Sequence, residues 1–225
     1  MSRYWVIIPA AGVGARMQAD CPKQYLSLCG KTVLEQTLSL FTHIDAVQQV
    51  VVVVSRDDAY WQKTIKHSKI TTVIGGEARC DSVFNALTYL KTVADDDDWI
   101  LTHDAARPCV KPETIQQLMK QLANHPIGGL LAQPVRDTMK RSDTHGKIIN
   151  TVERDHLWHA QTPQMFRCGL LHQALVTAFK QNIQVTDEAQ AMELSGYYGQ
   201  LVPSDVTNIK ITHPEDLALA TFYLR

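Results

Sequence analysis

The run of five consecutive valines at Val50–Val54 constrains the fold most, because it suits only a strand that is buried on both faces. It lies within residues 48–55, which are too continuously apolar and β-branched for the half-exposed edge of a sheet. Strands that are covered on both faces are typical of parallel sheets, because helices cross over each face of such a sheet. The run therefore predicts an α/β fold with a mostly parallel central sheet.

Apolar segments of strand length alternate with helical patterns along most of the chain, as this fold class requires. Further strands are expected at residues 4–9, 70–74, 99–103, 129–132 and 200–202. Apolar residues three and four apart predict helices at residues 32–41, 58–67, 82–93, 112–124, 169–181, 186–194 and 214–223. We find no internal repeat and no linker, so the sequence predicts a single domain over residues 1–225.

The alternation breaks after Pro134, where a long polar segment follows. Residues 136–155 have little helical periodicity and centre on a turn near His145-Gly146, with a short extended segment on either side. This pattern predicts a projecting β-hairpin arm. A polar arm of this length gains little by packing on its own domain. We expect it either to be mobile or to pack on another subunit, in which case it is a dimerisation arm.

Composition and charge argue against several classes of function. A formal net charge of −1 is not that of a general nucleic-acid binder. No apolar stretch approaches the roughly 18 residues of a membrane span. The five cysteines form no C-x-x-C pair and the nine histidines lack ligand spacing, so neither a disulfide framework nor a zinc site is indicated. With no secretory signal at the start, we expect a reduced, cytoplasmic protein that binds neither nucleic acid nor membrane.

The segment VIIPAAGVGARMQADCPKQY, residues 6–25, predicts an anion-binding site at the end of the first strand. In open parallel sheets, ligands bind at the carboxyl ends of the strands. Glycine and alanine allow phosphate oxygens to approach backbone N–H groups closely. Arg16 and Lys23 add positive charge to the same place.

Several kinds of loop compete for this segment. A Walker loop needs G-x-x-x-x-G-K-[ST], which the residues after Gly12 do not supply. A dinucleotide fingerprint needs a glycine where Met17 stands, and Cys21-Pro22 interrupts the helix that should follow. The longer loop of a nucleotidyltransferase, which wraps a nucleoside triphosphate, agrees better with the segment. The remaining alternative is a tight strand-to-helix turn with incidental charges.

Two further strand ends point to the same edge of the sheet. GGEARCDSV follows the strand at residues 70–74, with a glycine pair at the turn and Asp81 or Ser82 placed to cap the next helix. Asp104 follows the strand at residues 99–103. An aspartate at this point can hold Mg²⁺ or a ribose hydroxyl, or it can cap the loop. The neighbouring His103 is expected to be structural.

The sequence resembles one enzyme family from the first strand to the last helix. The matching segments are PAAGVGARMQADCPKQY, GGEARCDSV, HDAARP, PVRDTMKR, TVERDHLWHAQTPQMF, TDEA, and NIKIT followed by PEDL. They are similar, in that order, to the 2-C-methyl-D-erythritol 4-phosphate cytidylyltransferases of the non-mevalonate isoprenoid pathway. The resemblance implies a Rossmann-like nucleotidyltransferase domain. It also implies a reaction of CTP with methylerythritol phosphate, giving CDP-methylerythritol and pyrophosphate, with Mg²⁺ as cofactor.

The resemblance also implies roles for individual residues. Arg16 and Lys23 would stabilise the crowded α-phosphate during attack, and Lys210 would position the reacting phosphates. Arg154 and Thr138 would hold methylerythritol phosphate from the arm of a neighbouring subunit, which implies a homodimer. The residues expected to line the CTP site are Ala10, Ala11, Gly12, Gly14, Gly76, Glu77, Ser82, Asp104 and Ala105.

Two further implications concern the metal and the departures from the family pattern. Mg²⁺ is expected to be held mainly by the CTP phosphates, with Asp104 as a candidate ligand. Thr207 stands where relatives often have aspartate, and Glu77 replaces an aspartate of some relatives with retention of charge.

The expected chemistry needs orientation and charge neutralisation more than a general base. The attacking phosphate is already ionised, because its second pKa is near ~6. Two like charges at 4 Å repel by about 4 kcal/mol at an effective dielectric near 20, and the two anions must meet in line. Three rival functions remain: a cytidylyltransferase for another polyol phosphate such as ribitol 5-phosphate, a hydride-transferring dinucleotide enzyme, and a nucleotide-sensing module without turnover.

Overall fold

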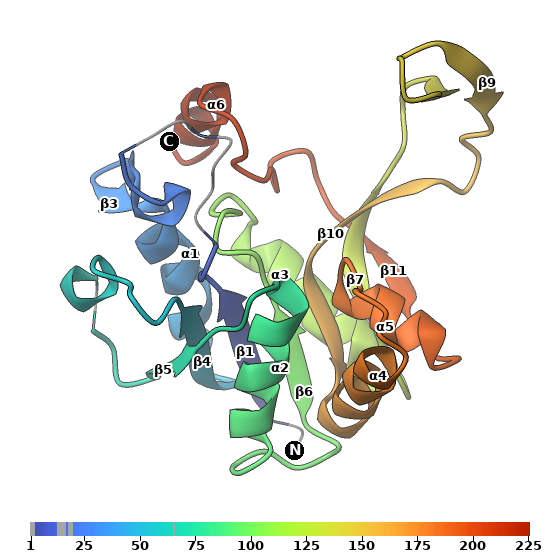
Figure 1. Ribbon diagram of the computed structural model, residues 1–225. Coiled ribbons are helices and arrows are strands. Elements are labelled where there is room, and N and C mark those ends of the chain that lie inside the picture. Colours follow the sequence, from blue (N-terminus) through green and yellow to red (C-terminus); the bar gives the residue numbers. More distant parts are fainter. Residues whose placement is uncertain (1–2, 13–16, 18–19, 65) are drawn as a thin grey trace.

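A seven-stranded sheet with the strand order β11-β7-β10-β6-β1-β4-β5 forms the centre of the described part of the chain (Figure 1). The computed structural model describes residues 3–12, 17, 20–64 and 66–225. The pairs β1–β4, β4–β5, β1–β6 and β7–β11 are parallel, while β10 runs antiparallel to both β6 and β7. The strands are β1 (Tyr4–Pro9), β4 (Val47–Val54), β5 (Ile70–Ile74), β6 (Trp99–Thr102), β7 (Gly128–Pro134), β10 (Trp158–Arg167) and β11 (Gln200–Pro203).

The valine run contributes to the hydrophobic core on both faces of the sheet. Val50 and Val52 pack in one hydrophobic cluster with residues of α1 (Val33–Thr42) and α3 (Pro112–Leu122). Val51 and Val53 pack in a second cluster with α2 (Arg79–Leu90), α4 (Cys168–Lys180) and α5 (Glu188–Leu194). Successive side chains of a strand point to opposite faces, so the continuous run buries β4 on both sides. The predicted mostly parallel α/β sheet is confirmed.

The remaining elements surround the carboxyl edge of the sheet. The segment after β1 contains the short 3₁₀ helix η2 (Lys23–Tyr25) and a small hairpin of β2 (Ser27–Leu28) and β3 (Lys31–Thr32). Helix α6 (Glu215–Tyr223) closes the chain beside this hairpin, in a third hydrophobic cluster that includes Leu28 and Ala220. Among the described residues, no helix is long and apolar enough to cross a membrane.

Helix starts follow the sequence signals closely. Thr32 Oγ1 accepts a hydrogen bond from the Glu35 backbone N–H at 3.1 Å, and the Glu35 carboxylate accepts from the Thr32 N–H at 2.7 Å. At the start of α2, the Asp81 carboxylate accepts from the Ala78 N–H at 2.8 Å. Asp81 therefore caps α2, but from inside the first turn, because the helix begins three residues earlier than predicted, at Arg79. The Ser82 hydroxyl accepts from the Gly76 N–H at 3.2 Å.

The expected strands and all but one of the expected helices are present, with ends shifted by a few residues. The helix expected at residues 58–67 is wrong: where the structure describes this segment, at residues 58–64 and 66–67, the one helical element is the 3₁₀ turn η3 (Trp61–Lys63). Asp58 Oδ1 accepts from the N–H groups of Tyr60 and Trp61, both at 2.9 Å, and Thr64 then turns to an extended conformation. An aspartate that bonds the backbone locally favours a single turn over a continued helix.

Strand β10 was not expected. It contains several polar residues, among them His159, Gln161 and Gln164, and it contains Pro163, and both features argue against a central strand. The register with β7 shifts between Ala160 and Gln164, so Pro163 falls in the irregular stretch of the ladder. The residues from Gln161 to Phe166 are buried between β6 and β7, and tertiary packing therefore determines this strand.

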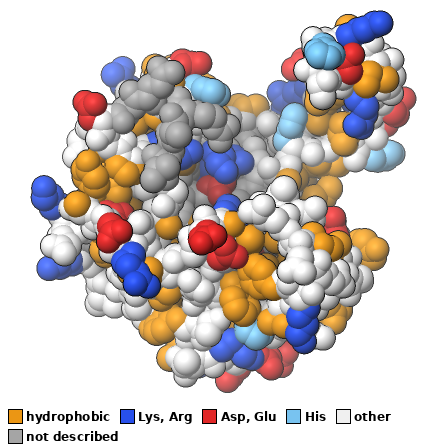
Figure 2. Space-filling model, in the orientation of Figure 1, with side chains coloured by type: hydrophobic (Ala, Val, Ile, Leu, Met, Phe, Trp, Pro, Cys, Tyr) orange, Lys and Arg blue, Asp and Glu red, His pale blue; other side chains and the backbone are white. Residues whose placement is uncertain are grey.

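The predicted β-hairpin arm is confirmed. Strands β8 (Met139–Ser142) and β9 (Ile148–Val152) pair antiparallel and project from the body of the protein (Figure 1). In the turn between them, Asp143 Oδ1 accepts from the N–H groups of His145 and Lys147, and Gly146 adopts φ +81°. In the space-filling view the arm stands apart and carries hydrophobic, basic and histidine side chains (Figure 2). Its role in dimerisation stays a prediction.

Candidate active site

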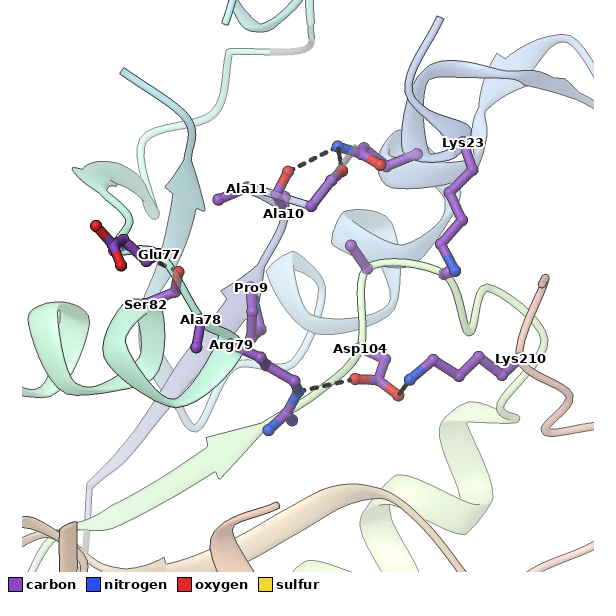
Figure 3. A pocket seen from close by; sticks show the side chains of 15 residues that line it. Pro9, Ala10, Ala11, Lys23, Glu77, Ala78, Arg79, Ser82, Asp104 and Lys210 are labelled. Carbon is purple, nitrogen blue, oxygen red and sulfur yellow. Dashed lines mark hydrogen bonds and ion pairs between the residues drawn. The ribbon is translucent and has the colours of Figure 1, made fainter. Parts of the chain in front are cut away.

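A cavity of about 290 Å³ lies at the carboxyl edge of the sheet, where the ends of β1, β5 and β6 meet η2 and the first turn of α2 (Figure 3). Basic and acidic side chains gather in a hollow near the middle of this face of the molecule (Figure 2). The lining residues are Pro9, Ala10, Ala11, Gly12, Lys23, Gln24, Gly76, Glu77, Ala78, Arg79, Ser82, Asp104, Ala105, Ala106 and Lys210.

Most of the residues predicted for the nucleotide site line this cavity. They are Ala10, Ala11, Gly12, Gly76, Glu77, Ser82, Asp104 and Ala105. The predicted catalytic residues Lys23 and Lys210 line the same cavity. Gly14 and Arg16 lie outside the described residues. Sequence reasoning missed Gln24 and Arg79, although both stand inside segments that carry the family resemblance.

Gln24 fixes the backbone of the first loop. Its buried side-chain amide donates to the carbonyl oxygens of Ala10 at 2.7 Å and Gly12 at 2.9 Å. The adjacent Lys23 points to the opposite side of the loop, and its Nζ donates to the Ile211 carbonyl at 2.8 Å (Figure 3). Lys23 and Lys210 are thereby brought to one cavity although 187 positions separate them in sequence.

The glycine pair after β5 allows the turn to pack tightly against neighbouring elements. A Cβ atom on Gly75 would lie 2.7 Å from the Ser82 hydroxyl and 2.8 Å from the Ala11 Cβ. A Cβ atom on Gly76 would lie 2.4 Å from the Asp81 Cβ. Such contacts are too short for real atoms, so glycine is required here for close approach and not merely for a flexible turn.

Asp104 is the electrostatic centre of the site. Its Oδ2 lies 2.9 Å from Lys210 Nζ and 3.3 Å from Arg107 Nε, and its Oδ1 lies 3.3 Å from Arg79 Nε. Burial opposes ionisation of this carboxyl, but the charges of Arg79, Lys210 and Arg107 hold its pKa well below its usual range. Asp104 is therefore ionised at neutral pH, and it gathers three cations at the mouth of β6.

Arg79 also pairs with a second carboxylate, that of Glu188. Arg79 Nη1 lies 2.8 Å from Glu188 Oε1, and Nη2 lies 3.1 Å from Oε2, so the guanidinium is held by both of its terminal nitrogens. The Glu188 side chain is only 1% exposed. Because these two residues are 109 positions apart, only the tertiary fold reveals the pair.

His103 packs behind Asp104 and is fully buried. One ring nitrogen lies 3.0 Å from the Arg107 carbonyl and the other 3.1 Å from the Thr162 hydroxyl. Burial lowers the pKa of His103 to about 4, so the ring is neutral at physiological pH. These contacts fit the expected structural role.

A second cavity of about 230 Å³ adjoins the first and shares Arg79, Asp104 and Lys210 with it. Its other lining residues are mostly polar and come from β10, the start of α5 and the loop after β6: Arg107, Ala160, Gln161, Thr162, Gln164, Thr186 and Asp187. A charged cluster shared by two cavities can hold two anionic reactants on either side of it.

Thr138 and Arg154 do not line either cavity. Both side chains are exposed on the arm, and the Arg154 guanidinium donates to the Arg136 carbonyl. Within a single chain, the structure therefore does not bring these two predicted residues to Asp104 and Lys210.

The described residues of the cavity supply few of the carboxylate groups that a metal ion needs. Among the described residues, no group of three or more histidine, cysteine, aspartate or glutamate side chains is placed to hold a metal. The Asp104 carboxylate already has three cationic partners. Mg²⁺ is commonly bound by one or two carboxylates together with substrate phosphates, and Asp104 is the carboxylate of this cavity that the sequence indicates as a candidate ligand.

Known proteins match the chain over its whole length. The family model for 2-C-methyl-D-erythritol 4-phosphate cytidylyltransferase (IspD) matches residues 4–225. A protein of that name from Vibrio vulnificus (strain CMCP6) is 49% identical over 226 residues, covering 100% of this chain and 95% of the relative. One from Pseudomonas putida (strain F1) is 50% identical over 217 residues, covering 95% of this chain and 92% of the relative.

Solved structures agree with this match. A crystal structure of 4-diphosphocytidyl-2C-methyl-D-erythritol synthase superposes with a TM-score of 0.88 at 39% identity, covering 100% of this chain and 99% of the other. The Francisella tularensis 2-C-methyl-D-erythritol 4-phosphate cytidylyltransferase gives a TM-score of 0.87 at 38% identity, covering 99% and 100%. The chain therefore belongs to the 2-C-methyl-D-erythritol 4-phosphate cytidylyltransferase family.

Proposed function

We infer that this chain carries out the reaction for which its family is named. It transfers the cytidylyl group of CTP to 2-C-methyl-D-erythritol 4-phosphate, giving CDP-methylerythritol and pyrophosphate. The observation that carries this inference, in a chain of this family, is the pair of adjoining cavities that share Lys210, Asp104 and Arg79. One cavity suits the nucleotide and the other the acceptor, with cations where their phosphates meet.

CTP occupies the first cavity in this proposal. The glycine-rich and alanine-rich backbone at Ala10–Gly12 and Gly76 leaves room for the nucleotide, and Ser82 and Asp104 offer polar contacts. Lys23 approaches the α-phosphate from η2. Arg16, which lies outside the described residues, is proposed to do the same from the loop after β1. Together the two cations oppose the negative charge that accumulates at phosphorus during attack.

The acceptor occupies the second cavity. Arg107 and Lys210 offer charge to its phosphate, and the exposed Thr186 hydroxyl offers a hydrogen bond to the polyol. An acceptor phosphate oxygen attacks the α-phosphorus of CTP, and the bond from that phosphorus to the bridging oxygen of the β-phosphate breaks. Pyrophosphate leaves with the electron pair of that bond. The nucleophile is ionised at neutral pH, so the step needs no general base.

Mg²⁺ belongs to this proposal as the cofactor. It would be held mainly by the CTP phosphates, with Asp104 as the candidate protein ligand. When bound, it would neutralise phosphate charge that the lysines and arginines leave uncompensated. Asp104 also holds Lys210 at 2.9 Å, so this carboxylate orders the site with or without a metal contact.

A homodimer completes the proposed site. Ile148 and Ile149 of β9 are each 62% exposed, which suits an arm that packs on a partner subunit. Thr138 and Arg154 of one chain would then reach the acceptor cavity of the other. The proposed location is the cytoplasm, which agrees with the five free cysteines of the described chain.

A pyrophosphate-release assay with each of the four common nucleoside triphosphates, paired with methylerythritol phosphate or ribitol 5-phosphate, tests the function. We expect rapid release only with CTP and methylerythritol phosphate, and no release when the acceptor is omitted. Release with ribitol 5-phosphate at an equal or higher rate would instead assign the chain to another polyol phosphate. Absence of turnover with every pair would identify a module that binds nucleotide without reacting.

A further inference from the structure

Glu188 stands outside both cavities, yet its carboxylate ends a chain of charged contacts that runs into them. The chain passes from Glu188 to the Arg79 terminal nitrogens at 2.8 and 3.1 Å, and from Arg79 Nε to Asp104 at 3.3 Å. It continues from Asp104 to Lys210 Nζ at 2.9 Å. Figure 3 shows its inner part, with Arg79 and Lys210 on opposite sides of Asp104 (Figure 3).

The burial of Glu188 calls for an explanation. An ionised carboxylate that is 1% exposed is costly unless it is paired and hydrogen-bonded. A hydrophobic residue at this position would serve packing at lower cost. Glu188 instead uses both oxygens on Arg79, an arrangement that fixes the plane of the guanidinium as well as its charge.

The backbone around Glu188 is itself held in place. Gln164 of β10 donates to Asp187 Oδ2 at 2.9 Å and accepts from the Ala189 N–H at 2.8 Å. Asp187 Oδ1 caps α5 by accepting from the Gln190 N–H at 2.9 Å. The first turn of α5 is thereby fastened to the sheet on both sides of Glu188, so the carboxylate is a fixed point for Arg79.

Arg79 lies at the boundary of the two cavities and could otherwise turn toward a substrate phosphate. A guanidinium that bound both Asp104 and a phosphate would compete with Lys210 for Asp104 and alter its direction. Glu188 opposes this rotation by accepting one hydrogen bond from each terminal nitrogen of Arg79, which holds the guanidinium against Asp104. The whole cluster of Glu188, Arg79, Asp104, Arg107 and Lys210 then has one more cation than carboxylates.

We propose that Glu188 is a positioning residue for the cytidylyl transfer and acts through Arg79 to keep Asp104 and Lys210 aligned between the two cavities. This inference rests on the proposed role of Lys210. Its consequence is that Glu188 affects the chemical step although it touches neither substrate.

The test compares Glu188→Gln with Glu193→Gln, a matched change at an exposed position of the same helix. We expect Glu188→Gln to lower kcat by about tenfold while KM for CTP changes less than about threefold, because misalignment acts on the transition state more than on binding. Glu193→Gln should equal the wild type. A purely structural role would lower the fraction of folded enzyme and leave the turnover of each folded site unchanged, which would overturn the proposal.

A double-mutant cycle with Arg79→Gln tests the route of the effect. If Glu188 acts through Arg79, Glu188→Gln should cause no further loss of kcat in the Arg79→Gln background. Multiplicative losses in the double variant would overturn the proposal. If Glu188→Gln does not fold, Arg79→Lys makes the same test, because a lysine cannot hold both carboxylates as the guanidinium fork does. Unchanged kcat in Arg79→Lys would then overturn it.

Lys210→Gln, measured beside these variants, separates this inference from the proposed function. If Lys210→Gln retains wild-type turnover, the role of Lys210 fails and this inference fails with it. If Lys210→Gln loses turnover while Glu188→Gln equals the wild type, only the positioning role of Glu188 fails.

Discussion

The side-chain amide of Gln24 donates a hydrogen bond of 2.7 Å to the carbonyl oxygen of Ala10, and so fastens η2 to the end of β1. A second bond of 2.9 Å reaches Gly12 from the same nitrogen. Lys23 is the neighbour of Gln24 in sequence, so the same turn sets the place of a proposed catalytic cation. The loop that surrounds the nucleotide and the lysine that acts on it are thus positioned by one buried side chain.

Replacing Gln24 by methionine removes the donor and keeps the volume. Two backbone carbonyls then lose a partner, and we expect a loss of about 1–3 kcal/mol in the free energy of unfolding. We also expect KM for CTP to rise more than kcat falls. Denaturant unfolding and steady-state kinetics measure both effects, with Gln117→Met at an exposed position of α3 as the control. Wild-type values for Gln24→Met would show that the two hydrogen bonds do not shape the site.

Removing either proposed catalytic cation should lower turnover without unfolding the protein. We expect Lys23→Ala and Arg16→Ala each to reduce kcat on the order of a hundredfold or more, as in other preorganised electrostatic sites. Thermal unfolding should stay close to the wild type. Lys180→Ala, at an exposed position at the end of α4, is the matched control for lost positive charge. A kcat close to the wild-type value in Lys23→Ala would show that Lys23 does not have the proposed catalytic role.

Substitution of Gly12 can show whether glycine is needed there for CTP binding or for folding. No described atom lies within 4 Å of a Cβ built on Gly12, although the residue lines the first cavity. Gly12→Ala should therefore fold with wild-type stability and bind CTP more weakly, because the added methyl group occupies space that we assign to the nucleotide. Gly76→Ala should differ by losing stability, because its Cβ would meet Asp81 at 2.4 Å. Calorimetric titration with CTP and thermal unfolding distinguish the two. Unchanged CTP affinity in Gly12→Ala would place the nucleotide elsewhere.

The buried His103 makes stability depend on pH in a defined direction. Its pKa is lowered to about 4 by burial, below the value of roughly 6.5 expected in the unfolded chain. The unfolded state therefore binds the proton more readily than the folded state. The contribution of neutral His103 to the free energy of unfolding is complete above pH ~6.5 and is lost as the pH falls toward 4. When the pH is lowered from 7.5 to 5, this effect reduces the free energy of unfolding by about 2 kcal/mol.

The measurement is urea unfolding at both pH values for the wild type and for His103→Gln, which keeps a polar group near the Arg107 carbonyl. We expect the pH-dependent loss to shrink by about 2 kcal/mol in the variant. Other titrating groups are common to both proteins and cancel in the comparison. Equal losses in the two proteins would mean that His103 is not held neutral by the fold.

A mixing experiment tests whether the arm completes the site of a neighbour. Arg154→Ala and Lys210→Ala should each be inactive alone. If Arg154 acts in the partner's site, a mixed dimer of the two variants contains one intact site. Random exchange of subunits should then restore about a quarter of wild-type activity. No recovery after demonstrated subunit exchange would confine Arg154 to its own chain or remove it from the mechanism.

The sequence predicts those parts of the fold in which the pattern of apolar residues indicates which side chains are buried. The valine run predicted β4 because only a doubly covered strand tolerates it, and the turn near Gly146 predicted the arm. The sequence did not predict strand β10, because the strand is buried by its neighbours β6 and β7 and not on account of its own apolar content. The apolar periodicity predicts a helix around Trp61 because that pattern carries no information on the hydrogen bond from the Trp61 N–H to Asp58, which favours a single 3₁₀ turn.

The residues of the candidate site likewise include some that the sequence predicts and some that only the structure reveals. Residues in glycine-rich or charged loops after strands, such as Lys23 and Asp104, could be placed because parallel strands end at one edge. The roles of Gln24, Arg79 and Glu188 could not, since each depends on partners that the fold brings from elsewhere in the sequence. The sequence predicts Asp104 in the nucleotide site, as a ligand of Mg²⁺ or of a ribose hydroxyl or as a loop cap, but its three cationic partners are visible only in the folded structure.

Diffraction from crystals grown with CTP and Mg²⁺ would show whether CTP binds in the first cavity, between the two lysines that we propose act on its phosphates. We expect the cytidine between Gly12 and Ser82, with the α-phosphate within hydrogen-bonding distance of Lys23 and facing Lys210. A triphosphate found elsewhere on the molecule, away from both lysines, would contradict it.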